Sequence, residues 1–237
     1  YKAQECSLYF QSWTNTYDSV DNLKSIYDKA LSYGPFREFI ISTRPDVLPD
    51  EVCALLASYS CDDMEVWVEL GLQTSNDETL KKINRGHDSY SYVSAVKRAH
   101  SYGLKVSTHV ILGLPGETRN DYLNTIDFVN EVGSEGVKIH NLHVPGGTRI
   151  ADDYLEGTFT ISSEERHLEN TELALRRLNP EIVVQRLICE TPMHRLIAPR
   201  HFPDKSLFLS HLERNMIEHG TMQGDDYKRS RSSSSSL

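Results

Sequence analysis

Short apolar runs alternate with amphipathic stretches along the first 150 residues of the chain. Each apolar run is rich in β-branched and aromatic residues and ends in polar or glycine-containing sequence, which is typical of a buried strand. Each amphipathic stretch carries apolar residues three or four positions apart, as on one face of a helix. The predicted strands are 8–10, 39–41, 66–72, 106–112 and 136–142, and four of the predicted helices are 20–31, 50–59, 90–103 and 121–132.

The stretch 66–87, VWVELGLQTSNDETLKKINRGH, is the clearest of these strand–helix repeats. A buried strand with one interior acid, Glu69, leads into a polar turn, and Asn76 or Asp77 then caps a short helix. Polar groups therefore gather at the carboxyl end of the strand, where parallel α/β folds bind their ligands.

Five such repeats predict the fold, because strands joined by helical crossovers pair in parallel and right-handed crossovers curl the sheet. The first residues already read as a strand, without an initiating Met. We therefore expect the chain to begin inside an α/β fold and to form a partial barrel.

After residue 148 the regular alternation of predicted strands and helices ends. A charged helix is expected over 161–178, opened by Ser162 with Glu165 in a capping box, and a strand over 182–188 and a helix over 202–220 follow. The expected organisation is a barrel over 1–150, a small C-terminal α/β extension over 151–224 and a disordered, serine-rich tail over 225–237.

Composition narrows the function only slightly. The net charge of −9 gives no bulk electrostatic reason to bind nucleic acid or an anionic membrane. No apolar run approaches the roughly 18 residues of a membrane span, and no signal peptide is recognisable, so we expect a cytoplasmic protein. The cysteines lie far apart without a CxxC motif, which predicts neither a zinc site nor a disulfide framework.

The stretch VKIHNLHVPGGT combines Lys138, His140 and His143 at the end of a predicted strand. A metal site would need a third ligand that the sequence does not nominate, so no metal ligands are assigned. Hydrogen bonding or proton transfer to a cofactor or substrate and a purely structural histidine pair both stay open.

Six ordered motifs then carry a resemblance to a known family. YFQSWTNTY, ISTRPDVLPDEV, WVELGLQT, INRGH, HVILGLPGET and GVKIHNLHVPGGT are similar to the radical S-adenosylmethionine superfamily. The resemblance is closest to the YhcC-type proteins, which are related to oxygen-independent coproporphyrinogen oxidase and to the elongator catalytic subunit. It covers nearly all of residues 8–224.

This resemblance implies a partial (β/α)6 TIM-like barrel that binds a [4Fe-4S] cluster and S-adenosylmethionine. The family cleaves the cofactor to a 5′-deoxyadenosyl radical, and a reducing partner such as flavodoxin or ferredoxin is implied, as is an unknown substrate. The family holds its cluster in a CxxxCxxC loop after the first strand, and no such triplet occurs here. We expect that segment to lie upstream of Tyr1 and the polypeptide as given to be inactive.

The resemblance also assigns cofactor-binding residues. Gln73 would contact the ribose diol and Arg85 the methionine carboxylate. The competing interpretations are a loop or capping amide for Gln73 and a surface ion pair with Glu78 or Asp88 for Arg85.

Further cofactor contacts follow from the ends of other predicted strands. The GLPGE turn, with Ile111 and Gly113, is implied to contact the adenine. Ser42 and Arg44 would face the same mouth of the barrel, and His143 is a further candidate for cofactor binding. The catalytic residue is not identified, and Glu69 and Asn15 could belong to the core or to the substrate site.

Three hypotheses on function remain. The first is a radical enzyme whose full-length form acts on an unknown substrate. The second is a barrel that binds S-adenosylmethionine or a nucleotide without catalysis, as a sensor or partner subunit. The third is an unrelated barrel hydrolase or aldolase with Lys138 as its lysine.

Overall fold

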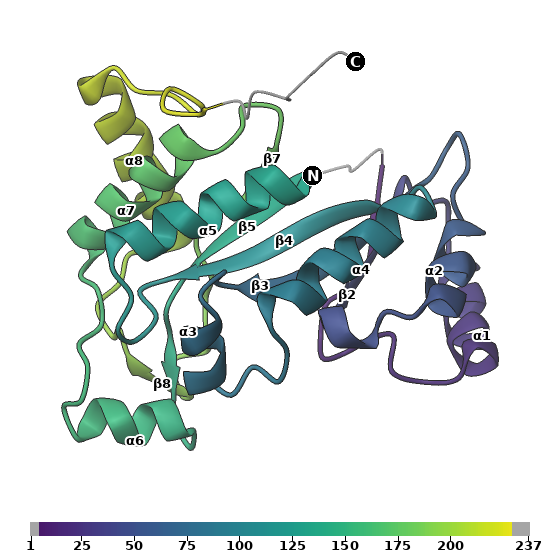
Figure 1. Cartoon of the computed structure of the whole chain (residues 1–237), viewed down its shortest axis with the longest axis horizontal. Helices are drawn as coiled ribbons and strands as arrows, with labels where there is room; N and C mark the ends of the chain where they lie inside the picture. Colours follow the sequence, from purple (N-terminus) through teal and green to yellow (C-terminus); the bar gives the residue numbers. More distant parts are fainter. Residues whose placement is uncertain (1–4, 229–237) are drawn as a thin grey trace, which may run out of the picture.

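The computed structural model describes residues 5–228, in which six strands form one parallel sheet in the order β1-β2-β3-β4-β5-β7. The sheet curls into a half-barrel, which confirms the predicted α/β partial barrel (Figure 1). Its strands are β1 Ser7–Phe10, β2 Glu38–Thr43, β3 Glu65–Gln73, β4 Lys105–Leu112, β5 Gly136–Asn141 and β7 Val183–Arg186.

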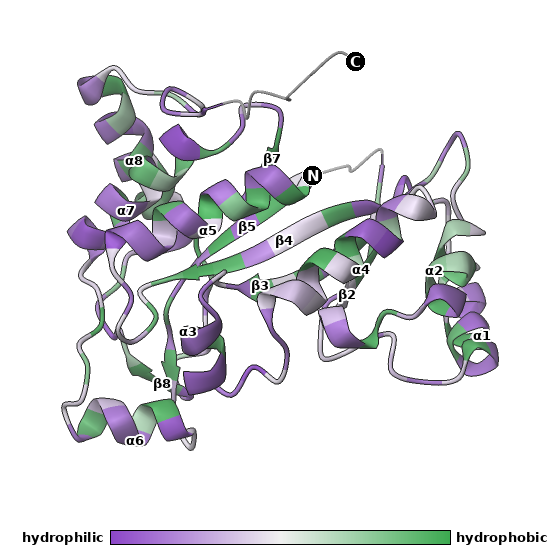
Figure 2. Ribbon diagram, viewed as in Figure 1, coloured by the Kyte–Doolittle hydropathy of each residue, from purple (hydrophilic) through white to green (hydrophobic). Residues whose placement is uncertain are grey.

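Helices follow the strands along the chain, and those between residues 89 and 177 pack in part against the sheet (Figure 1). The helices of the described residues are α1 Val20–Leu31, η1 Pro45–Val47, α2 Asp50–Ala57, α3 Asp77–Lys82, α4 Ser89–Ser101, α5 Arg119–Val132, α6 Arg149–Leu155, α7 Glu164–Arg177 and α8 Lys205–His219. Figure 2 shows hydrophilic and hydrophobic residues alternating along the helices, and hydrophobic stretches in the strands of the sheet.

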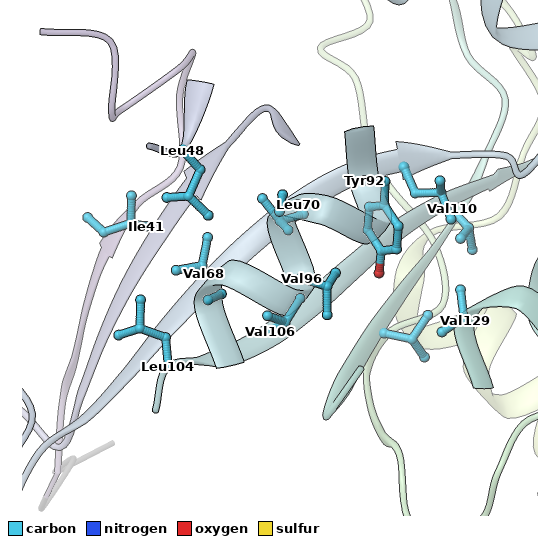
Figure 3. Close-up of a cluster of buried hydrophobic side chains, with 14 of the residues drawn as sticks. Ile41, Leu48, Val68, Leu70, Tyr92, Val96, Leu104, Val106, Val110 and Val129 are labelled. Carbon is cyan, nitrogen blue, oxygen red and sulfur yellow. The ribbon is translucent and has the colours of Figure 1, made fainter. Parts of the chain in front are cut away.

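The main hydrophobic core lies between the sheet and these helices. Val68 and Leu70 of β3 belong to the same buried cluster as Tyr92 and Val96 of α4 (Figure 3). Because successive side chains of a strand point to opposite faces, the residues between these positions point into the concave side, the lumen of the half-barrel. The core therefore fixes which polar side chains enter the lumen.

Helix caps set the direction in which the chain leaves the strands. The Asn76 side chain accepts hydrogen bonds from the backbone N–H groups of Glu78 and Thr79, at 3.1 and 3.3 Å, so Asn76 is the cap of α3. The predicted capping box at Ser162 is wrong by one residue, because Ser163 caps α7 and accepts from the Arg166 N–H.

The segment after residue 150 contributes to the sheet itself. β7 pairs in parallel with β5 and forms its sixth strand, while β8, Leu196–Ala198, pairs antiparallel with the two-residue β6, Val144–Pro145. The boundary expected at residue 150 stays a prediction, but the sheet continues past it.

The expected disordered tail over 225–237 stays a prediction, although its first residues contact α7. The Asp226 N–H donates to the Arg176 carbonyl of α7, and the two side chains form an ion pair, both at 2.8 Å. The rest of that prediction falls on residues 229–237, which lie outside the described residues. Within the described part of the chain, no helix has the length and apolar character needed to cross a membrane.

Candidate functional site

Four polar side chains meet inside the half-barrel, and we call Tyr9, Glu69, His109 and Lys138 the lumen network. The Tyr9 hydroxyl donates to Glu69 at 2.5 Å, and His109 Nε2 lies 3.1 Å from the same carboxylate. Lys138 donates to the other Glu69 oxygen and lies 4.6 Å from the centre of the Tyr9 ring. Strands β1, β3, β4 and β5 are thereby tied across the lumen.

The Glu69 side chain is only 1% exposed, so its charge needs partners. Burial acts to raise the pKa of this carboxyl, but hydrogen bonds from His109, Lys138 and Tyr9 outweigh it and lower the pKa to about 2. Glu69 is therefore an ionised group that its neighbours satisfy. These three contacts make Glu69 part of a polar network inside the half-barrel, and both alternatives for it, core network and substrate site, stay predictions.

His140 lies beside this network but does not join it. Its ring centre is 5.2 Å from that of His109, and its Nε2 atom is buried without a hydrogen-bond partner in the described part of the chain. Burial, and then the positive charges of His109, Arg186 and Lys138, lower the pKa of His140 to about 3. The ring is therefore neutral near pH 7 and has an unused nitrogen.

A second group of polar side chains lies at the carboxyl end of β3. Gln73, Arg85 and His87 surround Gly71 there, and we call these four residues the rim cluster. The Gly71 carbonyl accepts from Arg85 Nη2 at 3.0 Å and lies 3.1 Å from His87 Nε2. A Cβ atom on Gly71 would overlap Arg85 Nη2 and Gln73 Nε2. A larger residue at position 71 would therefore push the ends of these two side chains out of their present positions.

Gln73 ends β3 with a φ angle of 73°, at a register shift between β3 and β4. This left-handed backbone is uncommon for a residue other than glycine. The Gln73 amide has no hydrogen-bond partner among residues 5–228, and Asn76 caps the following helix. Gln73 is therefore not the helix cap that the competing interpretation suggested.

Arg85 has no ion-pair partner among the described residues. Glu78 pairs with Lys81 and Asp88 caps α4, so neither acid pairs with Arg85. Burial lowers the pKa of Arg85, and the neighbouring charge of Arg44 lowers it further. Because a guanidinium stays charged at neutral pH, the rim holds a half-buried cation whose described partner is a neutral carbonyl.

Ser42 lies in β2, and Arg44 follows the end of that strand, near Arg85. Arg44 donates two hydrogen bonds to Asp46, at 2.9 and 2.7 Å, so its charge is already paired. The Ser42 carbonyl accepts a hydrogen bond from Asn15 Nδ2 at 2.9 Å, so Asn15 connects the loop after β1 to β2. The Ser42 hydroxyl has no described partner.

The end of β4 forms a separate feature. Ile111 lies opposite His140 in the sheet register, and the Gly113 backbone has a φ angle of 95°. Gly113 lines a cavity of about 550 Å³ together with Glu117 and Tyr122. Neither Arg85 nor Gln73 lines that cavity, so the structure does not bring all the predicted cofactor residues into one pocket.

His143 lies apart from both groups and contacts the segment 189–204. Its Nδ1 is 2.6 Å from the Thr191 hydroxyl and its Nε2 is 2.8 Å from the Asn141 amide. It lines a cavity of about 620 Å³ with Cys189 and Met193. Both ring nitrogens are occupied, and the role in cofactor binding stays a prediction.

The cysteines do not fit an iron–sulfur cluster, which needs several thiolates around one centre. All four are free, and Cys6 lies next to the amino end of β1, opposite the rim. Among residues 5–228, no three His, Cys, Asp or Glu side chains are arranged to hold a metal ion. The described residues thus supply candidate contacts for S-adenosylmethionine but no ligand set for the cluster.

Comparison with known proteins identifies the family of the chain. The model of the radical SAM superfamily matches residues 8–129, and that of the Radical_SAM C-terminal domain matches residues 134–218. Protein YhcC of Escherichia coli K12 is 37% identical over 220 residues, which cover 92% of this chain and 71% of that protein. An uncharacterized protein of Methanocaldococcus jannaschii, MJ0486, is 34% identical over 218 residues, covering 92% and 68%.

The fold matches a solved structure as well. The archaeal Elp3 of Methanocaldococcus infernus with an N-terminal deletion superposes with a TM-score of 0.81 at 20% identity. The match covers 92% of this chain and 55% of that one, so the chain spans about half of the Elp3 structure. The chain belongs to the radical SAM superfamily, and its similarity to YhcC-type proteins is confirmed.

Several residues of both groups were not nominated from the sequence. Tyr9 was recognised only as part of a strand, although its alternate position in that strand is a signal for the lumen face. His87 was recognised only as part of the INRGH motif, because its contact with Gly71 depends on how the chain folds back after α3.

Proposed function

We propose that the chain is the S-adenosylmethionine-binding half-barrel of a radical enzyme that acts on a still unidentified substrate. The observation that carries this proposal is the rim cluster, where Arg85 and Gln73 converge over Gly71 without side-chain partners of their own in the described residues. Both lie at the carboxyl end of the parallel strands, the usual place for ligands in such folds.

Arg85 would bind the methionine carboxylate of the cofactor. A guanidinium matches a carboxylate with two parallel hydrogen bonds, and such charge-assisted bonds are stronger than bonds between neutral groups. The present partner of Arg85 is the neutral Gly71 carbonyl. A carboxylate at this place would therefore compensate a charge that the described protein leaves uncompensated.

Gln73 would bind the ribose diol, since its amide supplies both a donor and an acceptor. The proximity of Gln73 Nε2 and Arg85 Nη2 to the same point above Gly71 supports a shared ligand. Ile111 and Gly113 stay proposed contacts for the adenine, Ser42 and Arg44 flank the mouth, and His143 keeps its proposed role.

When bound, the cofactor would supply the 5′-deoxyadenosyl group with which radical enzymes of this superfamily attack their substrates. The described residues do not hold a [4Fe-4S] cluster, so no step through a cluster is derived for them. A reducing partner such as flavodoxin or ferredoxin remains part of the proposal for the full-length enzyme.

Isothermal titration calorimetry of this chain with S-adenosylmethionine tests the proposal. We expect measurable binding that weakens about 10-fold or more in Arg85→Gln, because a hydrogen bond to a charged group contributes about 1.5–3 kcal/mol. Gln73→Ala should weaken binding less, since its bonds are neutral.

Lys97→Gln, on the exposed surface of α4, is a matched control that should bind as the wild type does. Absence of binding, or equal binding by Arg85→Gln and wild type, would overturn the proposed site. Binding to the chain together with no release of 5′-deoxyadenosine by the full-length protein, reconstituted with iron and sulfide, would favour the sensor or partner-subunit hypothesis.

A further inference from the structure

Next to the lumen network lie two basic side chains, His140 and Arg186, that have unused nitrogen atoms in the described part of the chain. One is His140, whose buried Nε2 has no hydrogen-bond partner in the described part of the chain. The other is Arg186, at the end of β7, whose side chain forms no hydrogen bond or ion pair with residues 5–228. Unused donors inside a barrel are a sign of a ligand site.

The position of Arg186 follows from the sheet. It lies opposite Lys138 in the register of β5 and β7, immediately after a register shift. Residues paired in register on neighbouring strands point to the same face of the sheet, and Lys138 points into the lumen. In agreement with this position, the charge of Arg186 acts to lower the pKa values of Tyr9, Lys138 and His140. Arg186 and His140 are therefore on the same side of the sheet as the lumen network.

The charges of the lumen do not balance. Lys138 and Arg186 are cationic. Glu69 is the carboxylate that acts electrostatically on both Lys138 and His140. Glu69 already accepts hydrogen bonds from Lys138 and Tyr9 and contacts His109, so it is fully engaged. The lumen thus carries an excess positive charge next to Arg186, which favours an anion.

We propose that Arg186 and His140 bind a carboxylate group of the substrate inside the half-barrel. Arg186 would hold both carboxylate oxygens, and the unused His140 nitrogen would donate to one of them. The ligand class is a small carboxylic acid, and its role as substrate rests on the proposed function.

This site differs from the one proposed for the cofactor carboxylate. Arg85 contacts the Gly71 carbonyl at the end of β3, whereas Arg186 ends β7, and β4 and β5 lie between the two strands. A carboxylate in the lumen and one at the rim can therefore be distinguished by which arginine variant loses binding.

The test is calorimetric titration of the chain with succinate, a small dicarboxylate, and with succinamide, its neutral analogue. We expect succinate to bind and succinamide not to bind. Arg186→Gln should weaken succinate binding about 10-fold or more, as expected for loss of a charge-assisted pair. Arg195→Gln, which removes an exposed arginine, should leave it unchanged.

A second readout uses the ring nitrogens of His140. In ¹⁵N-labelled protein, succinate should shift the His140 Nε2 signal in the wild type and in Arg85→Gln, and not in Arg186→Gln. This signal depends on ligand contact rather than on stability, and circular dichroism checks that each variant is folded.

Several results would overturn the proposal: no succinate binding, equal binding by Arg186→Gln, equal binding of inorganic phosphate, or displacement of succinate by S-adenosylmethionine. The last result would assign the lumen to the cofactor carboxylate. Succinate binding in a chain that does not bind S-adenosylmethionine would support the lumen site while contradicting the proposed function, so the two failures can be told apart.

Discussion

The lumen network and the rim cluster both consist of polar side chains, but only those of the lumen network have side-chain partners. In the lumen network, Glu69, Lys138, Tyr9 and His109 satisfy one another across four strands. In the rim cluster, the amide of Gln73 and the charge of Arg85 are left without side-chain partners among residues 5–228.

The difference separates groups that hold the barrel together from groups that are available to a ligand. A buried charge that loses its partner destabilises the fold strongly, so the lumen network should respond to substitution with a loss of stability. A half-buried arginine that contacts one carbonyl contributes little to stability, so the rim cluster should respond with a loss of binding.

The largest effect is expected for Glu69→Gln. It leaves Lys138 as an uncompensated charge with a side chain only 7% exposed, so the free energy of unfolding should fall by about 3–5 kcal/mol in urea titrations. Glu65→Gln in the same strand removes an exposed pair with Lys105, and should cost at most about 1 kcal/mol. Equal, small losses in both variants would contradict the structural role of the lumen network.

The ionisation of Glu69 should also be visible in the pH dependence of the free energy of unfolding. The pKa of Glu69 is lowered in the folded state from 4.5 to about 2, so its contribution is complete above pH 4.5 and is lost as the pH falls toward 2. The stability difference between wild type and Glu69→Gln, measured by urea unfolding, should therefore shrink across this window. A difference that stays constant would show that Glu69 is not ionised in the folded protein.

Gly71→Ala should affect binding more than stability. The new Cβ would displace the ends of two flexible side chains, Arg85 and Gln73, which can move away at a stability cost of about 1 kcal/mol. Affinity for S-adenosylmethionine should fall about 10-fold or more, because both side chains leave their positions. Gly34→Ala, where a Cβ meets no atom within 4 Å, is the control. Unchanged affinity in Gly71→Ala would contradict the proposal that the rim cluster binds S-adenosylmethionine.

The smallest effect is expected for Glu78→Gln. Glu78 pairs with Lys81 three residues away on the exposed surface of α3, and such pairs contribute about 0.2–0.5 kcal/mol. Thermal unfolding and calorimetry should show nearly unchanged stability and affinity. A clear change in affinity would indicate that Glu78 does act on Arg85, as one interpretation of the sequence suggested.

The fold was largely predictable because the apolar periods of strands and helices are regular. The helix predicted over 20–31 coincides with α1, and five strands were recognised within a few residues of their ends. β7 was expected in a separate extension, since pairing between β5 and β7 is a long-range contact without a local sequence signal. The contact of Asp226 with Arg176 likewise joins segments about 50 residues apart, for which the sequence has no local signal.

The site was predictable only in part. Strand ends and the resemblance to the superfamily nominated Gln73 and Arg85, which do converge. His143 and Gly113 were nominated in the same way, but they line two other cavities. Which polar side chains remain unpaired depends on tertiary packing, and this is why Arg186 was not recognised from the sequence.

The most direct measurement of the central claim compares S-adenosylmethionine with decarboxylated S-adenosylmethionine in wild type and Arg85→Gln. If Arg85 binds the methionine carboxylate, the wild type should prefer the intact cofactor about 10-fold or more, and this preference should vanish in Arg85→Gln. If the wild type binds both compounds equally, or if the variant keeps the preference, Arg85 is not the carboxylate-binding residue and the rim cluster is not the cofactor site.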